Sequence, residues 1–134
     1  MRPERFQAFA LDVIKNARGA VRVRSLADAG DSKHPFGFAV TTAVGESTWQ
    51  IMGQLADGER HEHQESPVEG APAAWTDAQP GDSAEAWLAA AIGQAESPEI
   101  SRIDRWSARE GAESDRQGLT VFFHDGSRAF VRML

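Results

Sequence analysis

The residues best suited to chemistry lie in a short run near the middle of the chain, His61-Glu62-His63-Gln64-Glu65. In an extended backbone, side chains two positions apart point the same way, so His61 and His63 could bind a divalent metal together with Glu65 or Glu69. The flanking residues are polar and rich in glycine and proline, whereas a metal ligand must be held firmly in place. We therefore keep His61, His63 and Glu65 as candidate ligand-binding residues and expect no bound metal.

Arginines form a second candidate site. Arg102, Arg105 and Arg109 are three and four residues apart, so a helix would place them on one face, where guanidinium groups can bind a phosphate or carboxylate. On a strand they would divide between the two faces. We keep Arg102 and Arg105 as candidate ligand-binding residues. A further set could form a small anion-binding patch: Arg18, Arg22 and Arg24.

Sequence signatures of common catalytic sites are missing. The chain has no phosphate-binding glycine-rich loop, no nucleophile elbow and no His-Glu-x-x-His zinc motif. It also has no cysteine, which removes thiolate catalysis, thiolate metal sites and disulfides. These absences favour a non-catalytic protein over an enzyme. They give no reason to expect a cofactor or a catalytic residue.

The charge is negative overall but unevenly distributed. The 134 residues carry 14 Lys or Arg and 20 Asp or Glu, a formal net charge of −6, and the acidic excess falls within residues 25–99. Nucleic-acid binding draws most of its affinity from phosphate neutralisation, so this balance disfavours a nucleic-acid partner. No apolar run approaches the ~20 residues of a membrane span, and no secretory signal stands out. We expect a cytoplasmic protein without a membrane partner, and the many arginines and alanines suggest a bacterial source.

A long acidic segment at 57–81, rich in Gly and Pro, separates two halves of the chain. Segments longer than ~12–15 residues without secondary structure are uncommon in compact domains, and are usually functional or disordered. Trp75 is its one large apolar residue. The segment is either a solvated linker that Trp75 anchors to the domain or a lid over a ligand, in which case Trp75 is a candidate ligand-binding residue.

Two amphipathic helices must position these residues. Residues 6–17 and 84–95 each place apolar side chains at i, i+3, i+4, i+7, i+8 and i+11, one stripe of a helix. Pro3 suits the first turn of the first helix. Asp82 followed by Glu85 is typical of a capping box at the start of the second.

Strands account for most of the remaining chain. Alternation at period two predicts a short strand at 21–24 and a hairpin of 36–44 and 48–55 with its turn at 45–47. Residues 100–108 suit a helix or a strand, and we favour a strand because Ser97-Pro98 ends the preceding helix.

The clearest turn signal is Asp125-Gly126, between two β-prone runs within 119–134. It predicts a two-residue hairpin loop that places Val121 opposite Phe130 and leaves apolar groups on both faces of the ribbon. A ribbon that is apolar on both faces must be covered on both sides.

We therefore predict a single α+β domain over residues 1–134. A mainly antiparallel sheet of about six strands would carry two helices on one face, with a possible αβββ-αβββ pseudo-repeat. A homodimer is the simplest cover for the second, apolar face. The predicted core residues are Phe38, Trp49, Ile51, Trp87, Val121 and Phe130.

This order of elements is similar to that of the dimeric chaperones of bacterial secretion systems, although no sequence motif accompanies the similarity. The resemblance also includes the small size and the acidic charge of the chain, and it implies a protein that binds another protein. The hairpin with two apolar faces, the acidic centre and the missing catalytic motifs lead to our first hypothesis, a non-catalytic adaptor or chaperone-like module that binds a protein partner or itself. The alternative is a small-ligand-binding domain or enzyme with a pocket under 57–81, using His61, His63 and nearby carboxylates.

Overall fold

The computed structural model describes residues 1–109, 111 and 116–134. The first half of the chain forms α1 (Pro3–Lys15), β1 (Arg22–Ser25), β2 (Gly37–Thr42) and β3 (Gly45–Gln54). The second half forms α2 (Ala84–Gly93), β4 (Ile100–Arg105), the 3₁₀ helix η1 (Trp106–Ala108), β5 (Gly118–Phe123) and β6 (Arg128–Met133). The strand expected at 100–108 is confirmed over Ile100–Arg105 as β4, whereas Trp106–Ala108 forms η1 instead. The turn expected at 45–47 lies instead at 43–44, because Gly45 already pairs with Thr42.

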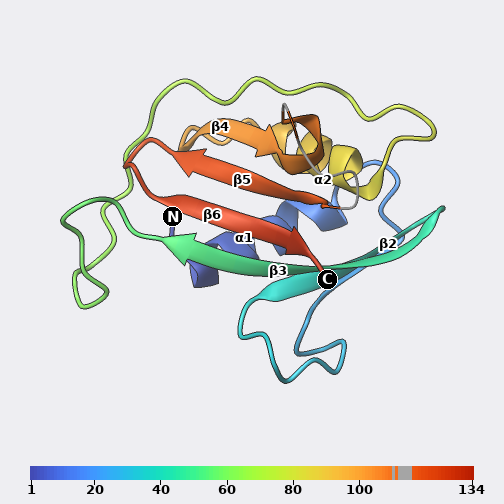
Figure 1. Cartoon of the computed structure of the whole chain (residues 1–134), viewed down its shortest axis with the longest axis horizontal. Coiled ribbons are helices and arrows are strands. Elements are labelled where there is room, and N and C mark those ends of the chain that lie inside the picture. Colours follow the sequence, from blue (N-terminus) through green and yellow to red (C-terminus); the bar gives the residue numbers. More distant parts are fainter. Residues whose placement is uncertain (110, 112–115) are drawn as a thin grey trace.

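All six strands join one antiparallel sheet in the order β1-β2-β3-β6-β5-β4. The two halves of the chain meet where β3 pairs with β6. Both α-helices lie behind the sheet in Figure 1 and contact each other there. The α+β class with two helices on one face is confirmed. Each half has the order αβββ, but the pseudo-repeat itself stays a prediction.

The first helix forms as its apolar stripe predicts. Pro3 occupies the first turn, where a missing N–H loses no hydrogen bond, and Phe6, Ala10 and Ile14 are fully buried against the sheet. Gly53 on β3 lets this helix start close to the strand, because a Cβ there would lie 2.6 Å from Cγ of Pro3. Neither described helix is long and apolar enough to cross a bilayer.

The second helix starts differently from the expectation. Ser83 is the N-cap, and its hydroxyl accepts a hydrogen bond from the Ala86 N–H at 3.2 Å. The predicted capping box of Asp82 and Glu85 is therefore wrong. The Glu85 side chain turns into the protein, where it is fully buried.

The hairpin of β5 and β6 forms, but its predicted register is wrong. The N–H of Phe123 donates to the carbonyl of Ser127, and Gly126 has a φ of 91°, so the loop contains three residues rather than two. Val121 consequently pairs with Ala129 instead of Phe130. A shift of one residue moves a side chain to the other face of the sheet, and Phe130 lies on the face away from the helices.

The core lies between the helices and the sheet. Four of the predicted core residues are buried there, at 0–2% exposure: Phe38, Trp49, Ile51 and Val121. Trp87 is only half-buried, at the helix surface, where its Nε1–H donates to the carbonyl of Arg18 at 3.2 Å. Placing Phe130 in this core is wrong, because the hairpin register turns it outward.

Residues 57–81 form neither helix nor strand, and they run along the outside of the molecule past β4 and α2 (Figure 1). The segment is fastened in its middle by backbone contacts. The N–H of Gly70 donates to the carbonyl of Pro98 at 2.7 Å, and the His124 ring contacts the carbonyl of Ala71 at 2.8 Å. Ala73 is buried.

Candidate functional site

The most distinctive surface is the open face, which we define as the side of the sheet opposite the two α-helices. Successive side chains of a strand alternate between faces, so the residues between the buried core positions point to it. Its centre consists of Met52 on β3, Phe130 on β6 and Thr120 on β5, which lie side by side in the pairing register. Met52 is 37% exposed and Phe130 is half-buried. Thr120 is only 2% exposed, so Met52 and Phe130 form the small apolar centre of the open face.

Two arginines flank an aromatic ring at one end of the open face. Phe122 on β5 pairs with Arg102 on β4 and with Arg128 on β6. The guanidinium carbons of Arg102 and Arg128 lie 4.1 Å and 5.0 Å from the ring centroid. Stacking of this kind contributes about 0.5–1 kcal/mol at exposed sites, and it leaves the guanidinium N–H groups free to meet an anion. In Arg102 this anion is already present, because its Nε lies 3.2 Å from Asp104.

A second aromatic ring reaches the open face from η1. The Nε1–H of Trp106 donates to the Thr120 hydroxyl at 2.9 Å, and Arg109 donates to the same oxygen at 2.9 Å. The ring lies directly on β5, because a Cβ at Gly118 would be 2.4 Å from Cε3 of Trp106. Only glycine at this position leaves room for the tryptophan.

The open face is basic although the chain is acidic. Its strands contribute five arginines and two carboxylates. Arg24 pairs with Glu46 at 3.4 Å and Arg102 pairs with Asp104 at 3.2 Å. The other three arginines have no carboxylate partner among the described residues: Arg22, Arg128 and Arg132. The face therefore carries positive charge available for a partner.

A buried carboxylate holds the elements around Trp106 in place. Glu85 accepts hydrogen bonds from Nε of Arg105 at 3.0 Å, from the N–H of Gly118 at 2.9 Å, and from both the N–H and the hydroxyl of Ser107. Burial by itself raises the pKa of Glu85, but the hydrogen bonds from Ser107, Gly118 and Arg105 outweigh it and hold this pKa below its ordinary value. Arg105, a candidate ligand-binding residue, is therefore engaged in a contact that links β4 to α2.

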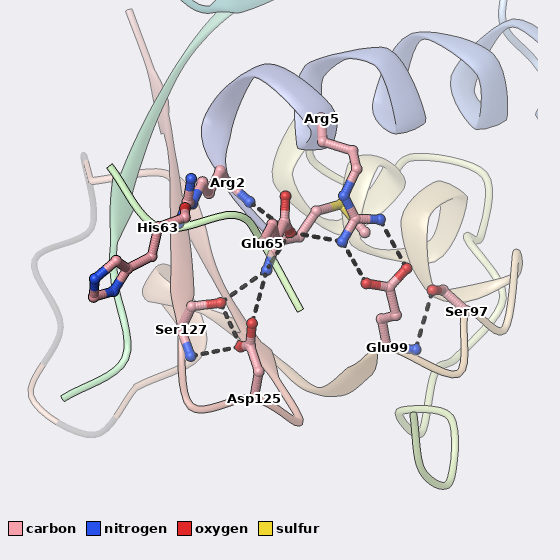
Figure 2. A network of polar contacts seen from close by, with 9 residues as sticks. Arg2, Arg5, His63, Glu65, Ser97, Glu99, Asp125 and Ser127 are labelled. Atoms are coloured by element: carbon pink, nitrogen blue, oxygen red, sulfur yellow. Dashed lines mark hydrogen bonds and ion pairs between the residues drawn. The ribbon is translucent and has the colours of Figure 1, made fainter. Parts of the chain in front are cut away.

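A second polar network, which we call the Arg5 network, fastens the beginning of the 57–81 segment (Figure 2). Arg5 on α1 donates to Glu65 at 2.6 Å and to Glu99 at 2.9 Å. The amino group of Met1 lies 3.6 Å from Glu65 and 3.7 Å from Asp125. Hydrogen bonds from Arg5 lower the pKa of Glu65 and of Glu99. Every one of these carboxylates thus has a cationic partner.

The two candidate histidines stand apart from these carboxylates. His61 and His63 are exposed, and their backbone carbonyls, not their rings, accept hydrogen bonds from Arg2. Glu65 faces Arg5, as Figure 2 shows, and its carboxylate also lies 3.6 Å from the amino group of Met1. Within the described part of the chain, no three His, Asp or Glu side chains come close enough to bind a metal. The expectation of no bound metal stays a prediction.

Trp75 and Arg105 meet at a different place, under the later part of the segment. Both line a cavity of about 200 Å³ between residues 74–77 and α2. Trp75 packs against Gly93 and donates to Glu96 at 3.2 Å. His61, His63 and Glu65 do not line this cavity, and Arg102 lies on the open face. The structure therefore divides the six candidate residues among three places.

The residues that define the open face were only partly anticipated. The patch of Arg22 and Arg24 lies on it, whereas Arg18 lies beyond the end of α1. Arg128 and Arg132 were not among the candidate residues. Their spacing of four in a strand places both on one face, which is a signal that could have been used. The hairpin register decides whether this is the open face or the face that the helices cover.

Comparison of the chain with protein-family models, with curated proteins and with solved structures finds no match. Any functional proposal therefore depends on the geometry of the molecule itself. Three features of the structure bear on function: the open face, the contacts of Glu85 and the Arg5 network.

Proposed function

We propose that the protein is a non-catalytic module that binds another protein through the open face of its sheet. The observation that carries this proposal is the difference between the two faces. The helices cover one face, whereas the other presents Met52 and Phe130 between arginines that stack on Phe122 and arginines without a carboxylate partner in the described part of the chain. Half-buried aromatic residues next to arginine are typical of protein-binding surfaces, where these residue types supply much of the binding energy.

The described carboxylates support a non-catalytic role. Glu85, Glu65 and Glu99 have lowered pKa values because donors already surround them. A carboxylate that acts as a general acid or base usually has a raised pKa and a free side directed at the substrate. These three side chains hold elements together instead.

The composition of the open face also bears on self-association. The expectation of a homodimer depends on an apolar second face, and this face carries five arginines. In a two-fold interface the same patch meets itself, so a patch with five arginines and two carboxylates would bring an excess of positive charge together. A homodimer stays a prediction, but we favour a different protein as the occupant of the open face.

Photo-crosslinking in cells of the source organism tests this proposal. A photoreactive residue at Gln54, which lies on the open face beside Arg128, should form an adduct with another protein. The same residue at Asp12, exposed on the outer side of α1, is the matched control and should give no such adduct. Adducts only at position 12, or nuclease-sensitive adducts at position 54, would contradict the proposal.

A further inference from the structure

We propose that the partner is an extended, acidic polypeptide segment in which an apolar residue is flanked by carboxylates two positions away on each side. This inference rests on the proposed function, because it names the chemistry that the open face recognises. It follows from the order of side chains along β6, where Arg128, Phe130 and Arg132 all point to the open face.

The spacing on β6 sets the spacing in the partner. Residues two apart in a strand are separated by about 6.6 Å, so Arg128 and Arg132 lie about 13 Å apart with Phe130 midway. An extended segment of the form Glu-x-Leu-x-Glu has the same period. Its two carboxylates can reach the two guanidinium groups while its leucine packs on Phe130 and Met52.

The arginines are held ready for such a partner. Arg128 stacks on Phe122 at 5.0 Å, and Arg132 donates to the side chain of Gln50 at 2.9 Å. Neither has a carboxylate partner among the described residues. Because their side chains are already oriented, less rotamer freedom is lost when a carboxylate binds.

The same face is less suited to single-stranded nucleic acid. Stacking of successive bases needs a row of free aromatic rings, but Phe122 is flanked by two arginines, and the Trp106 ring lies on Gly118 with Arg109 nearby. Of the three described aromatic rings on this face, only that of Phe130 is left for stacking. A polyanion that extended past the face would also meet a chain whose net charge is −6. A short acidic segment avoids that repulsion.

Fluorescence anisotropy with synthetic peptides tests the inference. The probe is a labelled 12-residue peptide with two Glu-x-Leu-x-Glu units, and the matched control peptide has glutamine in place of every glutamate. We expect the acidic peptide to bind, its affinity to fall as salt is raised, and the glutamine peptide to bind at least about tenfold more weakly.

Protein variants locate the binding. The double variant Arg128→Gln and Arg132→Gln should lose about tenfold or more in affinity. The control variant Lys15→Gln and Arg18→Gln, at the end of α1, should bind as the original protein does. Circular dichroism confirms that each variant is folded, and the glutamine peptide tests charge recognition without altering the protein.

Three results would overturn the inference: equal binding of the glutamine peptide, an unchanged affinity in the Arg128 and Arg132 variant, or tighter binding of a 12-nucleotide oligouridine. Sedimentation of the protein alone provides a further outcome. A dimer that the Arg128 and Arg132 variant abolishes would make a second copy the occupant and contradict a separate acidic partner.

If position 54 crosslinks to a protein while the acidic peptide fails to bind, only the acidic chemistry is wrong. If both fail, the proposed function is wrong as well.

Discussion

Replacing Glu85 with glutamine should destabilise the fold, because this carboxylate joins four elements through a single buried group. It is 0% exposed and accepts hydrogen bonds from Arg105, from Gly118 and from the N–H and hydroxyl of Ser107. Glutamine keeps one acceptor oxygen but turns an N–H₂ group toward some of these donors. It also leaves Arg105 without its carboxylate.

The expected cost follows from these contacts. Hydrogen bonds to a charged group contribute about 1.5–3 kcal/mol each, and breaking a buried ion pair costs about 3–5 kcal/mol. Arg105 is 39% exposed, so water screens its part of the interaction. We therefore expect Glu85→Gln to lower the free energy of unfolding by roughly 2–4 kcal/mol. For a chain of this length, that corresponds to a decrease in Tm of roughly 8–16 °C.

Urea unfolding followed by tryptophan fluorescence measures this loss. The matched control is Glu96→Gln, just beyond the other end of α2, where an exposed carboxylate accepts one hydrogen bond from Trp75. The control should change the free energy of unfolding by less than about 0.5 kcal/mol. A Glu85→Gln variant as stable as the original protein would refute the structural role. A more stable variant would indicate a strained functional carboxylate instead.

Three further predictions concern the Arg5 network, Trp106 and the histidines. Hydrogen bonds from Arg5 lower the pKa of Glu65 and the pKa of Glu99. The stability that these hydrogen bonds add is therefore present above the ordinary carboxyl pKa, and it is lost as the pH falls through the lowered pKa values. Arg5→Gln should therefore reduce the urea midpoint most at pH 7 and progressively less as the pH falls below the ordinary carboxyl pKa; an equal reduction at pH 7 and in acid would contradict this. Gly118→Ala should displace the Trp106 ring and lower the free energy of unfolding by about 1–3 kcal/mol. Tryptophan emission should change with it, and an unchanged emission would show that the ring has not moved. Elemental analysis should find no stoichiometric metal, and chelator should leave Tm unchanged; about one zinc per chain that His61→Ala removes would show that the histidines bind it.

The elements of the fold were predictable from local patterns. Phe6, Ala10 and Ile14 recur at helical spacing, and the alternation through Trp49 and Ile51 marks a strand with one buried face. Such patterns depend on residues a few positions apart. They identify helices, strands and most of the core without knowledge of the tertiary contacts.

The hairpin register was harder to predict. Asp125-Gly126 fits a two-residue loop, but it equally fits a three-residue loop in which Gly126 takes the left-handed position. The choice depends on how β5 and β6 pack against the helices. It decides whether Phe130 lies in the core or on the open face, and with it the character of that face.

The candidate sites were partly missed for a related reason. Glu85 finds its donors at Arg105, Ser107 and Gly118, and no local pattern joins positions so far apart. Arg128 and Arg132 belong with Arg102 only because β5 lies between their strands. His61 and His63 were conspicuous because they are close in sequence, but the structure gives their rings no common partner among the described residues.

The central claim is that the arginines of the open face bind an acidic segment, and arginine side-chain NMR tests it most directly. The Nε–H signals of Arg128 and Arg132 should shift progressively when the Glu-x-Leu-x-Glu peptide is added, together with the backbone amides of β6. The Nε–H signal of Arg18, at the end of α1, should stay in place. Shifts confined to α1 and α2, or to the groove of about 400 Å³ lined by Val44, Trp87 and Leu134, would show that the peptide binds elsewhere and would contradict the claim.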